Sequence, residues 1–117
     1  MTQLNQYLRI SVDVMNKIRI TVKGEFALPF GTKGLPEAPT EVLKHIVLVV
    51  TRSGNYQSVT PFQNVVVFPD DVKVKEDICS GFFNINVMDH IAFDGEGDYY
   101  LSCSVGTILS NTMLCTL

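Results

Sequence analysis

The chain has 117 residues, of which 46% are hydrophobic and 18% are charged, and its net charge is −3. This size and composition predict one folded domain spanning residues 1–117 and exclude a disordered chain. No apolar run approaches the roughly 18 residues of a membrane span, so we expect no membrane partner, and the acidic balance excludes nucleic-acid binding, which needs a basic face.

The charge is distributed unevenly along the chain. Residues 1–52 carry seven Lys/Arg and four Asp/Glu, whereas residues 53–117 carry two and eight. Basic N-terminal strands can pair with acidic C-terminal strands across a sheet. Alternatively, opposite poles of two copies can associate head to tail. The first residues lack the basic start and apolar stretch of a secretory signal, which predicts a cytoplasmic protein.

The first strands are predicted from strict alternation of apolar and polar residues. Residues 8–14 and 17–23 both place apolar side chains at even positions, which is typical of half-buried strands. A tight link at Asn16–Lys17 would make two strands, but the constant phase also allows one bent strand. Residues 28–40 hold three prolines and two glycines and are predicted to form a long loop.

Further strands are predicted toward the C-terminus. Thr40 is able to cap a helix, but the β-branched run at 46–50 favours a strand, and we expect one strand over Val42–Thr51. A turn is expected at residues 52–55. The remaining predicted strands are residues 65–68, a short edge strand at 72–74, and residues 83–87, 99–105 and 113–117. Seven or eight antiparallel strands without a convincing helix predict an all-β fold, a single β-sandwich.

The C-terminal part carries one resemblance to a known family. The acidic, glycine-rich stretch 94–98 leads into Tyr99, and a glycine turn and Ser110–Asn111 precede the last strand. From about Phe83 onward this resembles the closing hairpin of immunoglobulin-like sandwich domains. The resemblance implies that the Tyr99 hydroxyl bonds to upstream backbone. Because Leu101 stands where a disulfide cysteine would be and the chain has no tryptophan, it is most similar to the cysteine-free modules of bacterial proteins, which serve as spacers, adhesion units or interaction modules.

The phase of the last two strands limits their pairing. For Tyr99 and Cys115 both to face one core, the connecting loop must have an odd number of residues. A three-residue turn at 106–108 places Tyr99 opposite Cys115 and Cys103 opposite Asn111, whereas a five-residue loop places Cys103 opposite Cys115. We favour the first, which leaves the cysteines unbonded. Three cysteines without metal-type spacing are expected to be reduced and packed as small apolar residues: Cys79, Cys103 and Cys115.

The candidate metal ligands are the acids Asp94, Glu96 and Asp98, which alternate with glycines and offer oxygen ligands to Ca²⁺. A solvated corner loop is the alternative, because EF-hand spacing is missing. We predict no cofactor-binding residues, since no glycine-rich nucleotide motif occurs.

The sequence predicts no catalytic residues. Asp89–His90 with Ser102 or Ser104 would make a nucleophilic set, but nothing in the sequence brings them together. His45 is expected near the end of a strand. Asn84 and Asn86 form a polar outer row that can also bind sugars, with Tyr56, Phe62 or Tyr100 as stacking platforms.

Several strands have a second apolar face, formed by Val47, Val49, Val66, Phe68, Tyr100 and Leu114. This surplus lies either under the 28–40 loop or in an oligomer interface. The sequence therefore predicts a non-enzymatic protein-interaction or assembly module that self-associates as a homo-oligomer. The alternative is a sandwich that binds calcium or carbohydrate through the acidic loop 94–98.

Overall fold

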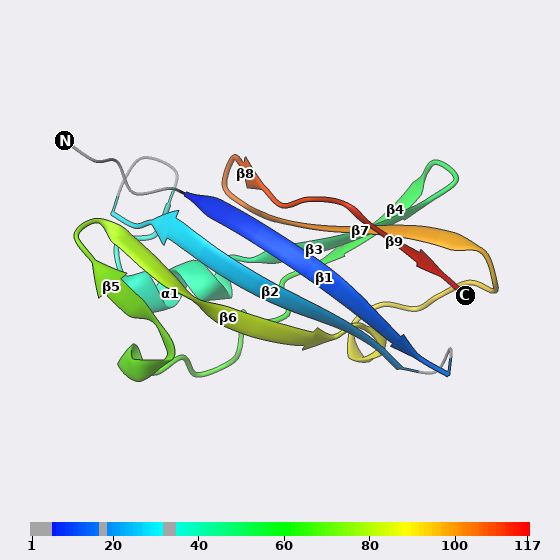
Figure 1. Ribbon diagram of the computed structural model, residues 1–117, viewed down its shortest axis with the longest axis horizontal. Coiled ribbons are helices and arrows are strands. Elements are labelled where there is room, and N and C mark those ends of the chain that lie inside the picture. Colours follow the sequence, from blue (N-terminus) through cyan, green and yellow to red (C-terminus); the bar gives the residue numbers. More distant parts are fainter. Residues whose placement is uncertain (1–5, 17–18, 32–34) are drawn as a thin grey trace.

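Two antiparallel β-sheets pack face to face in the computed structural model, which describes residues 6–16, 19–31 and 35–117 (Figure 1). Sheet A has the strand order β1-β2-β6-β5. In sheet B the order is β4-β3-β7, and β7 then pairs with β8 and, at its other end, with β9. The strands are β1 (Tyr7–Met15), β2 (Arg19–Pro29), β3 (Val47–Arg52), β4 (Asn55–Val59), β5 (Lys73–Lys75), β6 (Ile78–Asn86), β7 (Asp98–Val105), β8 (Ile108–Leu109) and β9 (Met113–Thr116). The predicted all-β sandwich is confirmed, with nine strands in the described part of the chain instead of seven or eight.

The alternating N-terminal pattern forms a hairpin. Strands β1 and β2 pair in a register that runs from Tyr7 opposite Ala27 to Met15 opposite Arg19, so the single bent strand is wrong. Most even-numbered apolar residues of the two strands are buried in the core, as the period of two requires, while Val14 near the end of β1 is exposed. Asn16 has a φ of 52° at the start of the connection. Lys17, the second residue of the predicted link, lies outside the described residues.

The prediction of one strand over Val42–Thr51 is wrong. Residues Pro39–Lys44 form helix α1, and β3 begins only at Val47. Proline at the first helical turn suits a helix start, and the apolar residues 42, 43 and 46 lie at helical spacing and are buried. Thr40 is not the cap, because Ala38 occupies that position without a side-chain cap bond. His45 ends the helix, and its Nδ1 lies 2.8 Å from the backbone oxygen of Glu41.

The prediction of a strand at residues 65–68 is also wrong. This segment is irregular and leads into the 3₁₀ turn η1 (Pro69–Asp71), and Val66 and Phe68 are exposed. The sheet position beside β3 is taken instead by β4, a polar strand that the apolar pattern did not predict. The short edge strand was expected at 72–74 and is found one residue later, as β5. The loop predicted at 28–40 is shorter, since β2 continues through Pro29 and α1 begins at Pro39.

The C-terminal register is confirmed in part. Tyr99 pairs with Cys115 as expected. The turn has two residues instead of three, because Val105 pairs with Ile108. The Ser110 N–H donates to the Cys103 carbonyl at 2.8 Å, so Ser110 and not Asn111 faces Cys103. The pairing of β7 with β8 and its pairing with β9 differ in register by one residue, and the segment between β8 and β9 accommodates this extra residue. All three cysteines are buried and free, as predicted.

One close contact fixes the packing between neighbouring strands of sheet A, and a second joins the two sheets. The Phe83 ring lies over Gly24, where an added Cβ would fall 1.9 Å from the ring, so only glycine fits there. The Asn111 side chain, between β8 and β9, accepts the Ile10 N–H and donates to the Ile10 carbonyl, each at 2.9 Å. This amide therefore ties the edge of sheet A to sheet B. No helix in the described residues has the length and apolar content to cross a membrane.

Candidate functional site

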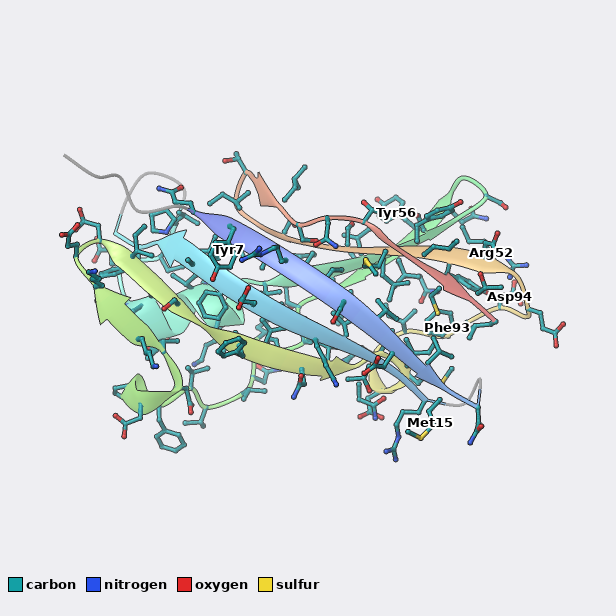
Figure 2. The ribbon with its side chains drawn as sticks, in the orientation of Figure 1. Tyr7, Met15, Arg52, Tyr56, Phe93 and Asp94 are labelled. Atoms are coloured by element: carbon teal, nitrogen blue, oxygen red, sulfur yellow. The ribbon has the colours of Figure 1, made fainter. Side chains whose placement is uncertain are left out.

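The acidic corner before β7 holds the guanidinium of Arg52. Nη1 of Arg52 donates to the backbone oxygen of Asp94 and, at 2.6 Å, to the Tyr99 hydroxyl, and Nη2 donates to the backbone oxygen of Glu96 at 2.7 Å. Figure 2 shows Arg52 and Asp94 together at one end of the molecule. The positive charge in this corner therefore comes from Arg52, the last residue of β3.

The three predicted calcium ligands are not gathered around one point. The corner meets the guanidinium with backbone oxygens, and the Asp98 carboxylate accepts a bond from the Thr116 hydroxyl at 2.7 Å. In the part of the chain that the structure describes, no three acidic, histidine or cysteine side chains form a metal-binding group. The backbone oxygens that converge in the corner point to the Arg52 guanidinium, which is a positive charge that the chain itself supplies.

The Tyr99 side chain stabilises the corner through its ring and its hydroxyl. Its buried ring packs edge-on against Phe93 at 4.8 Å between centroids, and the guanidinium carbon of Arg52 lies 4.9 Å from the ring centre. Its hydroxyl donates to the Gly95 backbone oxygen at 2.8 Å, which is the upstream backbone bond expected from the sequence. The corner needs Gly97 because its φ is 134° and a Cβ there would meet Arg52 at 3.1 Å.

A cavity of about 180 Å³ lies beside this corner. The Gln57 amide, which lines it, already donates to the Ala92 backbone oxygen at 2.6 Å. The lining contains no histidine, serine or cysteine, and no hydrogen bond between described residues joins a lining hydroxyl to the Asp94 carboxylate. The lining residues are Val50, Thr51, Arg52, Asn55, Tyr56, Gln57, Asp94 and Tyr99.

The other candidate catalytic groups stay apart. The Asp89 carboxylate accepts a bond from the Asn86 amide at 3.1 Å, while Ser102 and Ser104 lie in β7, and no hydrogen bond between described residues joins either serine to His90. Burial raises the pKa of the Cys103 thiol to about 12 and also raises the pKa values of Cys79 and Cys115. A thiol with a raised pKa is a poor nucleophile at neutral pH.

The outer face of sheet B differs from this corner in being uncharged. Because side chains alternate along strands, one set of residues points away from the core in every strand. We call this set the uncharged face: Val47, Val49, Thr51, Tyr56, Ser58, Tyr100, Ser102, Ser104, Leu109 and Leu114. Asp98 brings a charge only at one end of the sheet.

One row of this face crosses the whole sheet. Tyr56 pairs with Thr51, Thr51 with Tyr100, and Tyr100 with Leu114. The exposed fractions are 72% for Tyr56, 48% for Tyr100 and 52% for Leu114, so the described residues leave the row open to solvent. The predicted second apolar face therefore exists in β3, β7 and β9. Val66 and Phe68 do not belong to it, since they lie in the irregular segment.

The outer face of sheet A has the opposite character. Arg9 pairs with Glu25 and Lys23 with Asp13, each at 3.0 Å, across β1 and β2. The polar row predicted on β6, with Asn84 and Asn86, is exposed on this face. Phe82, which is 77% exposed, lies among these groups. The sequence analysis missed it, although its position out of phase with Phe83 was the available signal.

Of the aromatic residues proposed as sugar platforms, two share one surface. Tyr56 and Tyr100 both lie on the uncharged face, whereas the Phe62 ring packs edge-on against Phe83 at 5.8 Å. Arg52, the central residue of the corner, was predicted only as part of a turn. No family model, curated protein or solved structure compared with the chain matches it.

Proposed function

We propose that this protein is a non-enzymatic interaction and assembly module that associates with a second copy of itself through the uncharged face. The observation that carries the proposal is the contrast between the two outer faces. Two salt bridges lie on the outer face of sheet A, across β1 and β2, while a row of tyrosine and leucine side chains crosses sheet B without a charge. An exposed apolar patch of this kind is typical of a protein-binding surface.

Self-association follows from the chemistry of the face. A surface that carries charges of one sign repels its own copy, but two copies of the uncharged face bring no such repulsion. Tyrosines favour interfaces because the ring contributes apolar area and the hydroxyl tolerates a wet rim. Serine and threonine hydroxyls surround Tyr56 and Tyr100.

Two further observations support the non-enzymatic and cytoplasmic parts of the proposal. The buried thiols have raised pKa values, and the lining of the cavity beside Arg52 contains no histidine, serine or cysteine. Three free cysteines are compatible with a reducing compartment. The Tyr99-to-Gly95 bond supports the immunoglobulin-like interpretation, whose members include interaction modules.

The test is sedimentation velocity across a concentration series, comparing the wild type with Leu114→Lys. Leu114 is 52% exposed, so lysine fits in the monomer but places a charge on each of two meeting faces. We expect the wild-type mass to rise with concentration and the variant to stay monomeric. The matched control is Asn84→Lys, on the exposed outer face of sheet A, which should behave as the wild type.

A wild type that remains monomeric at millimolar concentration would contradict the proposal, as would equal loss of association in both variants. Thermal melting with and without Ca²⁺ checks the alternative function. A ligand that binds only the folded chain raises the melting temperature. An increase that disappears in Asp94→Asn would move the function to the acidic corner.

A further inference from the structure

Most sheet edges of this sandwich are protected against pairing with another chain. Natural proteins block such edges with short strands, lysines, prolines or covering groups. Strand β5 has three residues, two of them lysines, and follows Pro69. Strand β1 lies against β8 and β9, where the Asn111 amide binds the Ile10 backbone. The edge at β5 is therefore protected by its short length and its charge, and the β1 edge is protected at Ile10.

The edge strand β4 has none of these protections. Its sequence, Asn55–Val59, contains no charge, proline or glycine, and its first four residues are exposed. In the described part of the chain, β4 pairs only with β3. In Figure 1 the β3–β4 hairpin extends from one corner of the sandwich. This leaves a full edge of backbone donors and acceptors available.

The hairpin turn determines which groups point outward. Ser53 and Gly54, with φ values of 46° and 84°, form a two-residue turn, which closes on a hydrogen-bonded pair, here Arg52 and Asn55. Hydrogen-bonded and open pairs alternate along an antiparallel ladder. Gln57 therefore bonds toward β3, whereas the backbone N–H and C=O groups of Tyr56 and Ser58 point away from it.

We propose that β4 pairs antiparallel with β4 of a second copy, around a two-fold axis at Gln57. In this register Tyr56 of each copy faces Ser58 of the other, so all four outward N–H groups and C=O groups form four hydrogen bonds. Asn55 faces Val59, and no like charges meet. The outward N–H and C=O groups of β4 in one copy complement those of the other copy across the two-fold axis. A second copy therefore satisfies this uncharged edge without any further partner.

This edge is a surface distinct from the uncharged face, and the inference goes beyond the proposed function. The two are connected, because Tyr56 belongs to both. A two-fold axis perpendicular to the sheet keeps both outer faces on the same side. The pair would therefore present one continuous uncharged face of twice the width.

The register predicts which engineered cysteines can crosslink. Two copies of Gln57→Cys would be directly opposite in an open pair, where Cα atoms lie about 4.5 Å apart, within disulfide reach. Two copies of the control, Asn55→Cys, would be four residues out of register, roughly 13 Å along the strand. Both positions are on exposed β4, and the native cysteines are buried. We expect mild oxidation to give a covalent dimer of Gln57→Cys only. Equal yields from both variants, or none from either, would overturn the proposal.

Sedimentation of two edge variants gives an independent test. Ser58→Pro removes an outward N–H and leaves the bonds to β3 in place. Gln57→Lys retains a donor for Ala92 and places two like charges opposite each other. We expect at least about a tenfold weaker dimer for either variant that folds, judged by circular dichroism. If Leu114→Lys prevents association and both edge variants do not, this inference is wrong and the proposed function stands. The reverse result would retain the edge pairing and remove the face.

Discussion

The corner around Arg52 is expected to contribute strongly to stability, and Arg52→Met tests this. Methionine keeps much of the apolar stem but loses the three hydrogen bonds to Asp94, Glu96 and Tyr99. The part-buried bond to the Tyr99 hydroxyl is worth about 1.5–3 kcal/mol, as for other bonds to charged groups. The two exposed bonds contribute roughly 0.2–1 kcal/mol each. Together they give an expected loss of about 2–5 kcal/mol in the free energy of unfolding.

The loss is measurable by thermal melting. An unfolding entropy of about 2.1 cal/mol/K per residue gives roughly 0.25 kcal/mol/K for this chain, so the melting temperature should fall by about 8–20 °C. Combining Arg52→Met with Tyr99→Phe in a double-mutant cycle isolates their shared bond, with an expected coupling of about 1–2 kcal/mol. Arg9→Met is the matched control, because Arg9 is exposed, pairs with the Glu25 carboxylate and stacks over the Tyr7 ring at the surface, and it should cost under about 1 kcal/mol. A loss for Arg52→Met no larger than for Arg9→Met, or zero coupling, would refute the argument.

Three other substitutions test the packing of the sandwich. Gly24→Ala should destabilise the fold by about 1–3 kcal/mol, because the added Cβ would overlap the Phe83 ring. Urea unfolding measures this loss. Recovery of stability when Phe83→Leu is added would confirm the cause. Asn111→Ala should cost about 1–3 kcal/mol by leaving the Ile10 backbone unpaired, and Asn111→Gln should not restore it. For Cys103, whose pKa is raised from 9.0 to about 12, the folded state keeps a proton that the unfolded chain loses as the pH rises above 9. Wild-type stability should therefore fall by about 1.4 kcal/mol per pH unit more steeply than that of Cys103→Ala between pH 9 and 12, and parallel slopes would contradict this.

The parts of the fold that the sequence predicted are those governed by local alternation. The period of two in β1, β2 and β7 reflects which side chains face the core, and this pattern needs no knowledge of distant residues. The register of Tyr99 opposite Cys115 followed from the same rule. Where the pattern was ambiguous, it failed. Residues 42–46 fit either a helix or a strand, and burial under the sandwich selected the helix.

The site depended on contacts that local patterns do not contain. Arg52 and Asp94 are 42 residues apart, and only the pairing of β3 with β7 brings them together. The alternating acids suggested a metal, whereas the structure uses backbone oxygens of the same stretch for a guanidinium. Strand β4 was missed because it is an exposed edge with little apolar content, and its position depends on β3 alone. The uncharged face was predicted for β3, β7 and β9, since those strands carry apolar residues in both phases.

The amide of Asn111 has a consequence for how large any aggregate of this protein can grow. A fibril that grows by strand pairing needs two unpaired sheet edges on every subunit. At the β1 edge, the Asn111 side chain takes the place of a neighbouring strand at Ile10, because it offers the backbone of that residue both a donor and an acceptor. The Ile10 backbone is therefore not free to pair with a strand of another copy. Removing the Asn111 amide should expose these two groups and favour the addition of further copies at this edge.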